Sequence, residues 1–246
     1  MAGHSKWANT KHRKAAQDAK KNKIFSNIAK EITIAAKSGG DPDANPRLRT
    51  CIQKAKQANM PNDRINSAIK KGTGEDGGAV YEELVYEGYV NGIGIIVEVT
   101  TDNKNRSASD VRSTLTKAGG ELAKPGALAF SFARKGQFLI AAENGVTEDS
   151  LMEIAIEAGA EDVKNNGDHF EVLCEPNDYD TVSAALTDAN IACESSEIAY
   201  IPNNLVAVDE PEVAKRLIKL EDKLDEIDDV KAVWLNADIA ESLVDA

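Results

Sequence analysis

One stretch of the chain, residues 137 to 201, constrains the fold more than any other. It runs strand, helix, strand, strand, helix, strand, an order that is the signature of a ferredoxin-like unit. The pattern therefore predicts a separate α/β domain over residues 136–202. The successive segments are QFLIAA, EDSLMEIAIEAG, EDVKN, HFEVLCE, the helix from Asp178 to Ala189, and ACESSEIAYI.

Further strand and helix patterns stand on both sides of this unit. Before it come two strands, the second rich in Ile and Val, then a helix that two glycines end, and an alternating strand; a helix and a strand follow it. We expect these flanking parts to form one discontinuous α/β domain, residues 79–135 plus 203–246, into which the ferredoxin-like unit is inserted. The segments are Glu83 to Val90, Ile93 to Thr101, Asn105 to Ala118, Ala127 to Arg134, Glu210 to Glu226 and Val230 to Leu235.

The first 72 residues carry a helical pattern instead. Apolar residues from Phe25 to Ala36 recur at spacings of three and four, which is typical of a helix that buries one face. Asn45 and Pro46 favour the start of a second helix, as N-cap and first helical residue, and a third helix is expected to end at Lys71. A basic three-helix domain of residues 1–72 is thus expected, and the fold class is α+β: this domain followed by two α/β domains.

The charges are divided unequally along the chain. Residues 1 to 72 hold 16 Lys and Arg against 5 Asp and Glu, a net charge of +11, whereas the remaining residues carry a net −23, which gives −12 for the whole chain. A basic surface attracts phosphates, while an acidic body limits how a protein docks on a polyanion. We therefore expect the N-terminal domain to bind nucleic acid.

The candidate contact residues lie mainly on the first helix, which has little apolar surface to bury. A solvated helix face is the alternative, but so much charge of one sign repels itself without a partner. Trp7 either stacks on a base or packs as a lid on the core. Residues 47 to 71 have a helix-turn-helix outline, although an ordinary helical hairpin is favoured because few of their side chains suit base readout. The candidates are Lys6, Trp7, Lys11, His12, Arg13, Lys14, Lys20, Lys21, Lys23, Lys70 and Lys71.

A second anion site is expected where a strand meets a helix, at Asn103, Lys104, Asn105 and Arg106. A helix N-terminus favours anions. The equally weighted alternative is turn and N-cap chemistry by Asp102 and Asn105.

Catalytic and metal-binding patterns find little support in the sequence. No HExxH or Cys/His group surrounds the three histidines, and Gly72 to Gly77 matches GxGxxG without the preceding strand that a dinucleotide site needs, so that Gly72 to Gly78 is interpreted as a linker. The cysteines fit no CxxC pair and are expected to be small buried thiols. We expect a cytoplasmic, non-enzymatic protein without cofactor, metal or membrane contact. The residues concerned are His4, His12, His169, Cys51, Cys174 and Cys193.

Several blocks of the sequence closely resemble the YebC/PmpR family, whose mitochondrial relatives activate translation of a cytochrome oxidase subunit. They include GHSKWANTKHRKAAQDAKK, EITIAAKSGGDPDANPRLR, ANMPNDRINSAIKKGTGE, TDNKNRSASDVR and LDEIDDVKAVWLNAD. The resemblance implies a helical domain plus two α/β domains. Asn62 departs from the family pattern, which commonly has a Lys there.

Two functions follow from this resemblance. The first is a DNA-binding transcriptional regulator. The second is a translation factor associated with the ribosome or messenger RNA, including relief of stalling on proline-rich nascent chains. A protein-binding adaptor that uses the acidic lobes is a third hypothesis from a different class, and the oligomeric state stays open.

Overall fold

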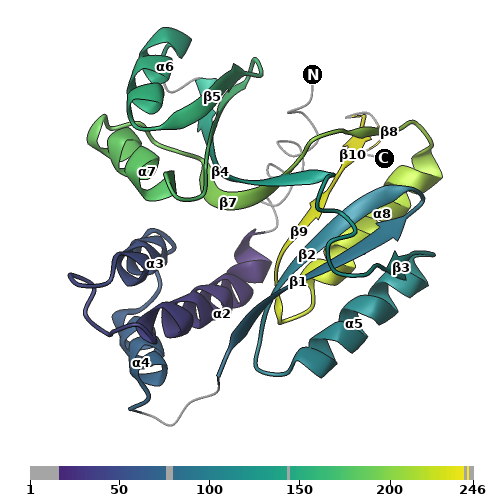
Figure 1. The fold of residues 1–246 in the computed structure, drawn as a ribbon, viewed down its shortest axis with the longest axis horizontal. Coiled ribbons are helices and arrows are strands. Elements are labelled where there is room, and N and C mark those ends of the chain that lie inside the picture. The colour runs from purple at the N-terminus through teal and green to yellow at the C-terminus, as the bar shows by residue number, and fades with distance from the viewer. Residues whose placement is uncertain (1–16, 76–79, 143–144, 241–242, 244–246) are drawn as a thin grey trace. The chain divides into compact units, whose positions relative to one another are not determined.

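The structure, a computed structural model, describes residues 17–75, 80–142, 145–240 and 243 (Figure 1). For residues 17–21 it describes the backbone alone. The described residues form two compact units. The first comprises residues up to 127 together with Glu210–Val233, and the second comprises Leu128–Asp209 together with the residues from Trp234 onward. Within the described part of the chain, no helix is long and apolar enough to cross a membrane.

Three helices in the first unit share one apolar core. Their inward faces contain Ile32, Leu48 and Ile65, each at most 4% exposed. The side chain of Asn45 accepts a hydrogen bond from the Leu48 backbone N–H at 3.1 Å, and this N-cap fixes the start of the second helix as predicted. The helices are α2 (Gln17–Ala36), α3 (Pro46–Gln57) and α4 (Asn62–Thr73).

The predicted linker from Gly72 begins too early. Gly72 and Thr73 are the last residues of α4, and Gly74, with φ of 86°, ends the helix in the left-handed conformation. A Cβ at Gly72 would overlap the backbone oxygen of Thr33 and lie 2.6 Å from the Cβ of Ala36. The glycine therefore lets α4 continue against α2, and this packing outweighs its low helix propensity.

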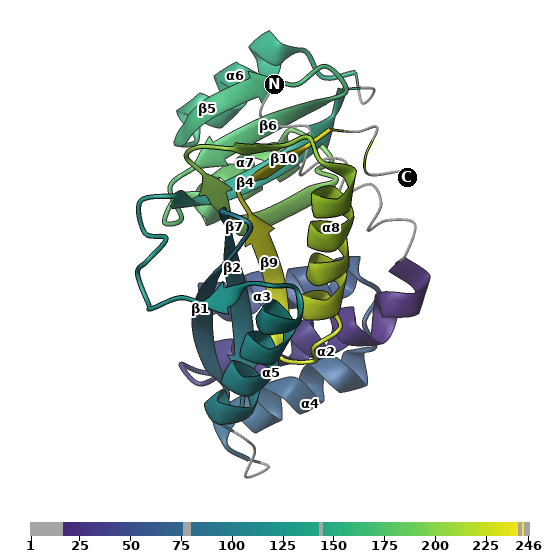
Figure 2. The same ribbon diagram turned by 90° about the vertical axis from the view of Figure 1, so that its right-hand side faces the viewer.

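A four-stranded sheet completes the first unit, in the order β3-β1-β2-β9. Asn91 and Gly92, both with positive φ, form the two-residue turn that joins β1 to β2. Helices α5 and α8 lie side by side on one face of the sheet (Figure 2). The elements are β1 (Glu82–Val90), β2 (Ile93–Thr101), α5 (Lys104–Lys117), β3 (Glu121–Leu122), α8 (Pro211–Asp225) and β9 (Val230–Leu235).

The second unit contains the predicted ferredoxin-like fold. Its sheet has the order β5-β6-β4-β7 with every pair antiparallel, and α6 and α7 cover one face of it (Figure 1). Phe138 and Tyr179 stack in the core with ring centroids 5.0 Å apart. The elements are β4 (Phe132–Ala141), α6 (Glu148–Glu157), β5 (Ala160–Asn165), β6 (His169–Cys174), α7 (Tyr179–Asp188) and β7 (Ser195–Pro202), beside a parallel pair of β8 (Val206–Val208) and β10 (Ala237–Ile239).

The strand expected over residues 127–134 differs from the structure. Residues 125–131 form turns, and one strand, β4, runs without a break from Phe132 to Ala141. Gly136 lies inside this strand, and a Cβ there would lie only 2.5 Å from the Sγ of Cys174, so the position packs closely against β6.

The α+β class and the ferredoxin-like lobe are confirmed. Strand β9, from near the C-terminus, lies beside β2 as a discontinuous middle domain requires. The proposed boundaries of the three domains stay a prediction.

Candidate nucleic-acid interface

Most of the predicted phosphate-contacting residues belong to the start of the chain. Lys6, Trp7, Lys11, His12, Arg13 and Lys14 lie outside the described residues, and Lys20 and Lys21 are placed in α2 by their backbone alone. Their role therefore stays a prediction.

Lys23 is the last of these basic residues on the first part of the helix. Its ammonium lies 3.6 Å from the carboxylate of Asp225 in α8, and both side chains are less than one-fifth exposed. This ion pair fastens α2 to α8, so Lys23 is less available to a phosphate than its position in the sequence suggests.

The last turn of α4 carries Lys70 and Lys71, both exposed. Lys56, at the end of α3, is exposed as well. Among the described residues, none of these three lysines forms an ion pair. A lysine at a helix C-terminus already interacts favourably with the helix dipole, yet its ammonium remains free to meet a phosphate.

Arg64 lies on the same helix and is held by an aromatic ring. Its guanidinium carbon lies 5.6 Å from the centroid of the Phe25 ring, in cation–π geometry. Phe25 in turn packs against the core of the three helices. The stacked guanidinium is thus positioned, although it has no carboxylate partner in the described part of the chain.

The loop that was expected to be a second anion site has a different arrangement. Asn103 is the N-cap, because its side chain accepts from the Arg106 backbone N–H at 3.1 Å, so the cap is neither Asp102 nor Asn105. Lys104 and Asn105 are the first exposed residues of α5. The Arg106 guanidinium donates to Asp102 at 2.9 Å and to Asp229 at 2.6 Å. An incoming anion would have to compete with two carboxylates, while the site itself stays a prediction.

Asp229 is the centre of a network that joins α2, β2 and α5 to the turn before β9. Its carboxylate accepts hydrogen bonds from Lys30 of α2 at 3.1 Å, from Thr101 of β2 at 3.0 Å, and from Ser107 and Arg106 of α5 at 2.8 Å and 2.6 Å. The side chain is 7% exposed. Burial by itself would raise the pKa of Asp229, but the hydrogen bonds from Arg106, Ser107, Lys30 and Thr101 outweigh it and lower the pKa to about 2.

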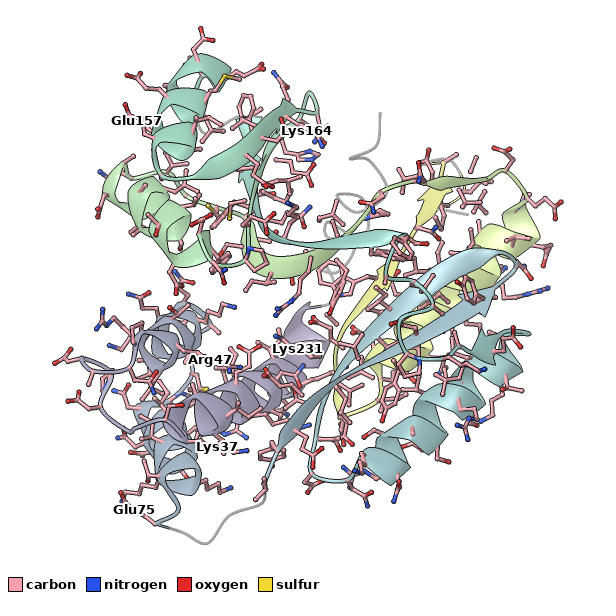
Figure 3. All side chains as sticks on the ribbon, in the orientation of Figure 1. Lys37, Arg47, Glu75, Glu157, Lys164 and Lys231 are labelled. Atoms are coloured by element: carbon pink, nitrogen blue, oxygen red, sulfur yellow. The ribbon has the colours of Figure 1, made fainter. Side chains whose placement is uncertain are left out.

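Other polar links also hold the three helices against the sheet. Glu31 accepts from Lys231 at 3.0 Å, and Arg47 donates to both carboxylate oxygens of Glu83 at 2.8 and 2.9 Å; Lys231 and Arg47 are labelled in Figure 3. Burial opposes the charge of Lys231, yet the carboxylate of Glu31 beside it raises the pKa of that ammonium. Ion pairs between oppositely charged side chains therefore fix the contact between the helices and the sheet.

A groove of about 820 Å³ opens above this network. One wall comes from α2 and α4 and includes Arg64, Ser67 and Lys71. The other comes from the end of β2, from α5 and from the turn between α8 and β9, and includes Asp110 and Asp228. The first wall is thus basic. The second is acidic on balance, because its only cation among the described residues, Arg106, is already paired with Asp102 and Asp229.

Sequence reasoning missed both Asp229 and the groove. The carboxylate lies more than 120 positions along the chain from Thr101, Arg106 and Ser107, and no local motif marks such a pairing. The Asp228-Asp229 pair directly before a predicted strand was the one available signal.

The three cysteines are free thiols, and Cys51 and Cys174 are buried as expected, whereas Cys193 is only half-buried. Burial raises the pKa of each thiol to about 11. They are therefore protonated at neutral pH.

Comparison with known protein families covers nearly the whole chain. Residues 5–75 match the model of the TACO1/YebC protein N-terminal domain, and residues 81–237 match that of the TACO1/YebC second and third domain. The division between the two models lies at the end of the three helices.

Full-length relatives carry the name "probable transcriptional regulatory protein". One from Maridesulfovibrio salexigens is 51% identical over 245 residues, covering 99% of this chain and 98% of the relative. One from Treponema pallidum is 49% identical over 246 residues, covering 99% of this chain and all of the relative. The crystal structure of a conserved hypothetical protein from Aquifex aeolicus superimposes with a TM-score of 0.82 at 41% identity, over 91% of this chain and 93% of that one.

Proposed function

This chain belongs to the TACO1/YebC family, and on that premise we propose that it is a nucleic-acid-binding regulator of gene expression, in the first place a DNA-binding regulator of transcription. The relatives bear the name of a transcriptional regulator rather than of an enzyme. The family that the sequence blocks resembled is the family that the comparisons identify.

The observation that carries the proposal is the excess of positive charge on the N-terminal domain. Its net charge is +11 over residues 1–72, and Lys56, Lys70 and Lys71 are exposed without ion pairs in the described part of the structure. Exposed lysines in this number favour a polyanionic partner. When their ammonium groups neutralise phosphates, the counterions condensed on DNA or RNA are released, and this release favours binding. The proposal places the binding surface on this domain.

The test is a pair of charge reversals with the same change in net charge. Lys11→Glu with Lys14→Glu should weaken binding of the full-length protein to a duplex of 24 base pairs by at least about tenfold at 100 mM salt, since two phosphate contacts are lost. Thermal melts of the same samples should agree with the wild type.

The matched control reverses Lys117 and Lys124, two exposed lysines outside the N-terminal domain. Lys117→Glu with Lys124→Glu should leave duplex binding nearly unchanged. If both pairs weakened binding equally, net charge rather than the basic domain would be responsible, and the assignment of the surface would be wrong. If the first pair lowered the melting temperature together with binding, those lysines would be structural.

A second candidate function is association with the ribosome or messenger RNA. It is favoured by the composition of the exposed basic set, which is mostly lysine, whereas its arginine on α4, Arg64, is stacked on Phe25. Lysine is a point charge that discriminates poorly between bases. Ribosomal RNA presents phosphates without requiring base readout in a duplex groove.

A further inference from the structure

We propose that the groove above Asp229 binds one unpaired guanine nucleotide of a single strand, with its phosphate on the basic wall and its base edge on the acidic wall. This inference rests on the proposed function, because it assigns a site within the nucleic-acid-binding unit. It adds a base preference, which a surface of lysines alone does not provide.

The basic side chains of this wall lie on one face of a single helix, α4. Arg64, Ser67 and Lys71 follow one another on α4 at spacings of three and four residues, and all three are exposed and line the groove. Lys71 supplies a mobile ammonium and Ser67 a hydroxyl, both donors to phosphate oxygens. Arg64 supplies a guanidinium that lies over the Phe25 ring, and a guanidinium plane is a surface on which a base can stack.

The acidic wall contains carboxylates that the protein does not use. Asp110 on α5 and Asp228 in the turn before β9 are exposed, and in the described part of the chain neither side chain has a hydrogen-bond or ion-pair partner. Asp229, by contrast, is fully engaged and belongs to the floor of the groove. The two free carboxylates are therefore available as acceptors for a ligand.

The floor of the groove is fixed by Lys30. Its ammonium donates to the Thr100 carbonyl at 3.1 Å, to the Asp228 carbonyl at 2.8 Å and to the Asp229 carboxylate at 3.1 Å. Three acceptors saturate the three donors of a lysine. The ammonium is thus committed to holding α2, β2 and the turn before β9 together and is not available to a ligand.

The two walls of this groove carry charges of opposite sign that, in the described part of the chain, do not pair with each other. No ion pair joins Arg64 or Lys71 to Asp110 or Asp228 within the described residues, although both walls border one groove of about 820 Å³. That volume lies within the range of small-molecule sites, about 300–1,000 Å³. A ligand that bridges the walls must carry negative charge at one end and hydrogen-bond donors at the other.

A nucleotide with a free base edge meets this requirement, and guanine meets it best. An ionised carboxylate only accepts hydrogen bonds, through two adjacent oxygens. The Watson–Crick edge of guanine offers two adjacent donors, N1–H and the N2 amino group, which match those oxygens. Uracil presents one N–H between two carbonyl oxygens, which a carboxylate repels. The base must be unpaired, since pairing would occupy this edge.

The experiment measures fluorescence anisotropy of the full-length protein with labelled five-nucleotide RNAs at one fixed salt concentration. UUGUU should bind at least about tenfold tighter than UUUUU, in line with the discrimination expected of a bidentate base contact. A pentamer with inosine in the central position, which lacks the N2 amino group, should bind between the two. The DNA pentamer TTGTT separates the two sources of the nucleotide: equal affinity assigns recognition to base and phosphate, and tighter RNA binding adds a contact to the 2′-hydroxyl.

Two sets of variants locate the preference. Asp110→Asn with Asp228→Asn should abolish the difference between UUGUU and UUUUU without weakening UUUUU, because only the base-edge acceptors change. Lys71→Gln should weaken all pentamers alike. The matched control is Lys117→Gln, an exposed lysine outside the N-terminal domain that does not line the groove. It should leave both the affinity for the pentamers and the preference for UUGUU unchanged.

Equal affinity of the wild type for UUGUU and UUUUU overturns the groove assignment, as does a guanine preference that survives in the double Asn variant. If duplex binding still depends on Lys11 and Lys14 in that case, the proposed function stands and only the groove is wrong. If the wild type binds no nucleic acid, both proposals fail.

Discussion

Asp229 departs further from an ordinary surface carboxylate than any other aspartate in the described structure. It is nearly buried, yet it is charged, because donors from Lys30, Thr101, Arg106 and Ser107 surround it. A buried charge is stabilised only when it is fully hydrogen-bonded. Asp229 therefore holds the helices, the sheet and α5 in one arrangement.

Replacing Asp229 with Asn should show how much this network contributes. The amide removes the charge and turns an N–H₂ group toward a surrounding donor, so we expect Asp229→Asn to lower the free energy of unfolding by about 2–4 kcal/mol. Urea unfolding followed by circular dichroism measures it. The neighbouring Asp228→Asn, at an exposed carboxylate, should stay within about 0.5 kcal/mol of the wild type. Equal effects at the two positions would show that the network does not stabilise the fold.

The same residue should make stability depend on acidity. Its pKa is lowered from 3.8 to about 2 in the folded protein, so the folded state holds its proton less tightly than the unfolded state. The contribution of Asp229 is therefore complete above its unfolded pKa of 3.8 and is lost as pH falls through the folded value near 2. Unfolding experiments from pH 5 to pH 2 should show a shallower decline for Asp229→Asn than for the wild type. Parallel curves would contradict this cause.

At the scale of elements, the packing of α4 on α2 depends on the absence of a side chain at Gly72. A Cβ there would overlap the Thr33 carbonyl oxygen and crowd Ala36, so the two helices would have to separate. Gly72→Ala should lower the free energy of unfolding by about 1–3 kcal/mol, although alanine favours helix elsewhere. Asn66→Ala, at an exposed position of the same helix, is the control and should be nearly neutral. A stabilised Gly72→Ala protein would mean that the helices are not in close contact at this point.

Gly72 also shows why the sequence alone does not predict where some helices and strands begin and end. Local patterns placed β2 and β9 without error, since both segments are rich in the branched and aromatic residues that favour strands. The end of α4 depends instead on the packing of Gly72 against α2, and Gly136, which looked like a break between two strands, lies inside β4 close to β6 and α7. A glycine that is required for close packing looks the same in a sequence as a glycine in a linker.

The candidate site likewise has features that the sequence predicts and features that only the structure shows. The basic character of the N-terminal domain follows from counting charges and needs no structure. The engagement of Lys23 with Asp225 and of Arg106 with Asp229 comes from contacts between residues that are far apart in the sequence. Sequence analysis therefore identifies which residues are charged, whereas the structure identifies which charges the fold has already neutralised.

For the whole molecule, the charge division should govern how binding responds to salt. Residues 1–72 carry a net charge of +11 and the rest −23, so we expect the attraction to a polyanion to come from residues 1–72 and to be mainly electrostatic. A protein that makes about six phosphate contacts should lose roughly a thousandfold in affinity between 50 and 200 mM salt. Titration of duplex DNA at four salt concentrations gives the slope. An affinity that is insensitive to salt would be incompatible with binding through lysines.

The identity of the polyanion is the remaining question at this scale. Sequence-specific readout of a duplex needs Arg, Asn or Gln at base edges, and the start of α4 offers only Asn62, Arg64 and Asn66, of which Arg64 is stacked on Phe25. We therefore expect weak discrimination between duplex sequences, well below the roughly thousandfold or more of dedicated operator binders. Competition between a candidate promoter fragment, a scrambled duplex and purified ribosomes, at one fixed salt concentration, measures this directly. A promoter preference above about a thousandfold would defeat the expectation and establish specific transcriptional control. Ribosomal RNA offers both dense phosphates for the lysines and unpaired bases for the groove. A strong preference for ribosomes would therefore assign the protein to the regulation of translation instead.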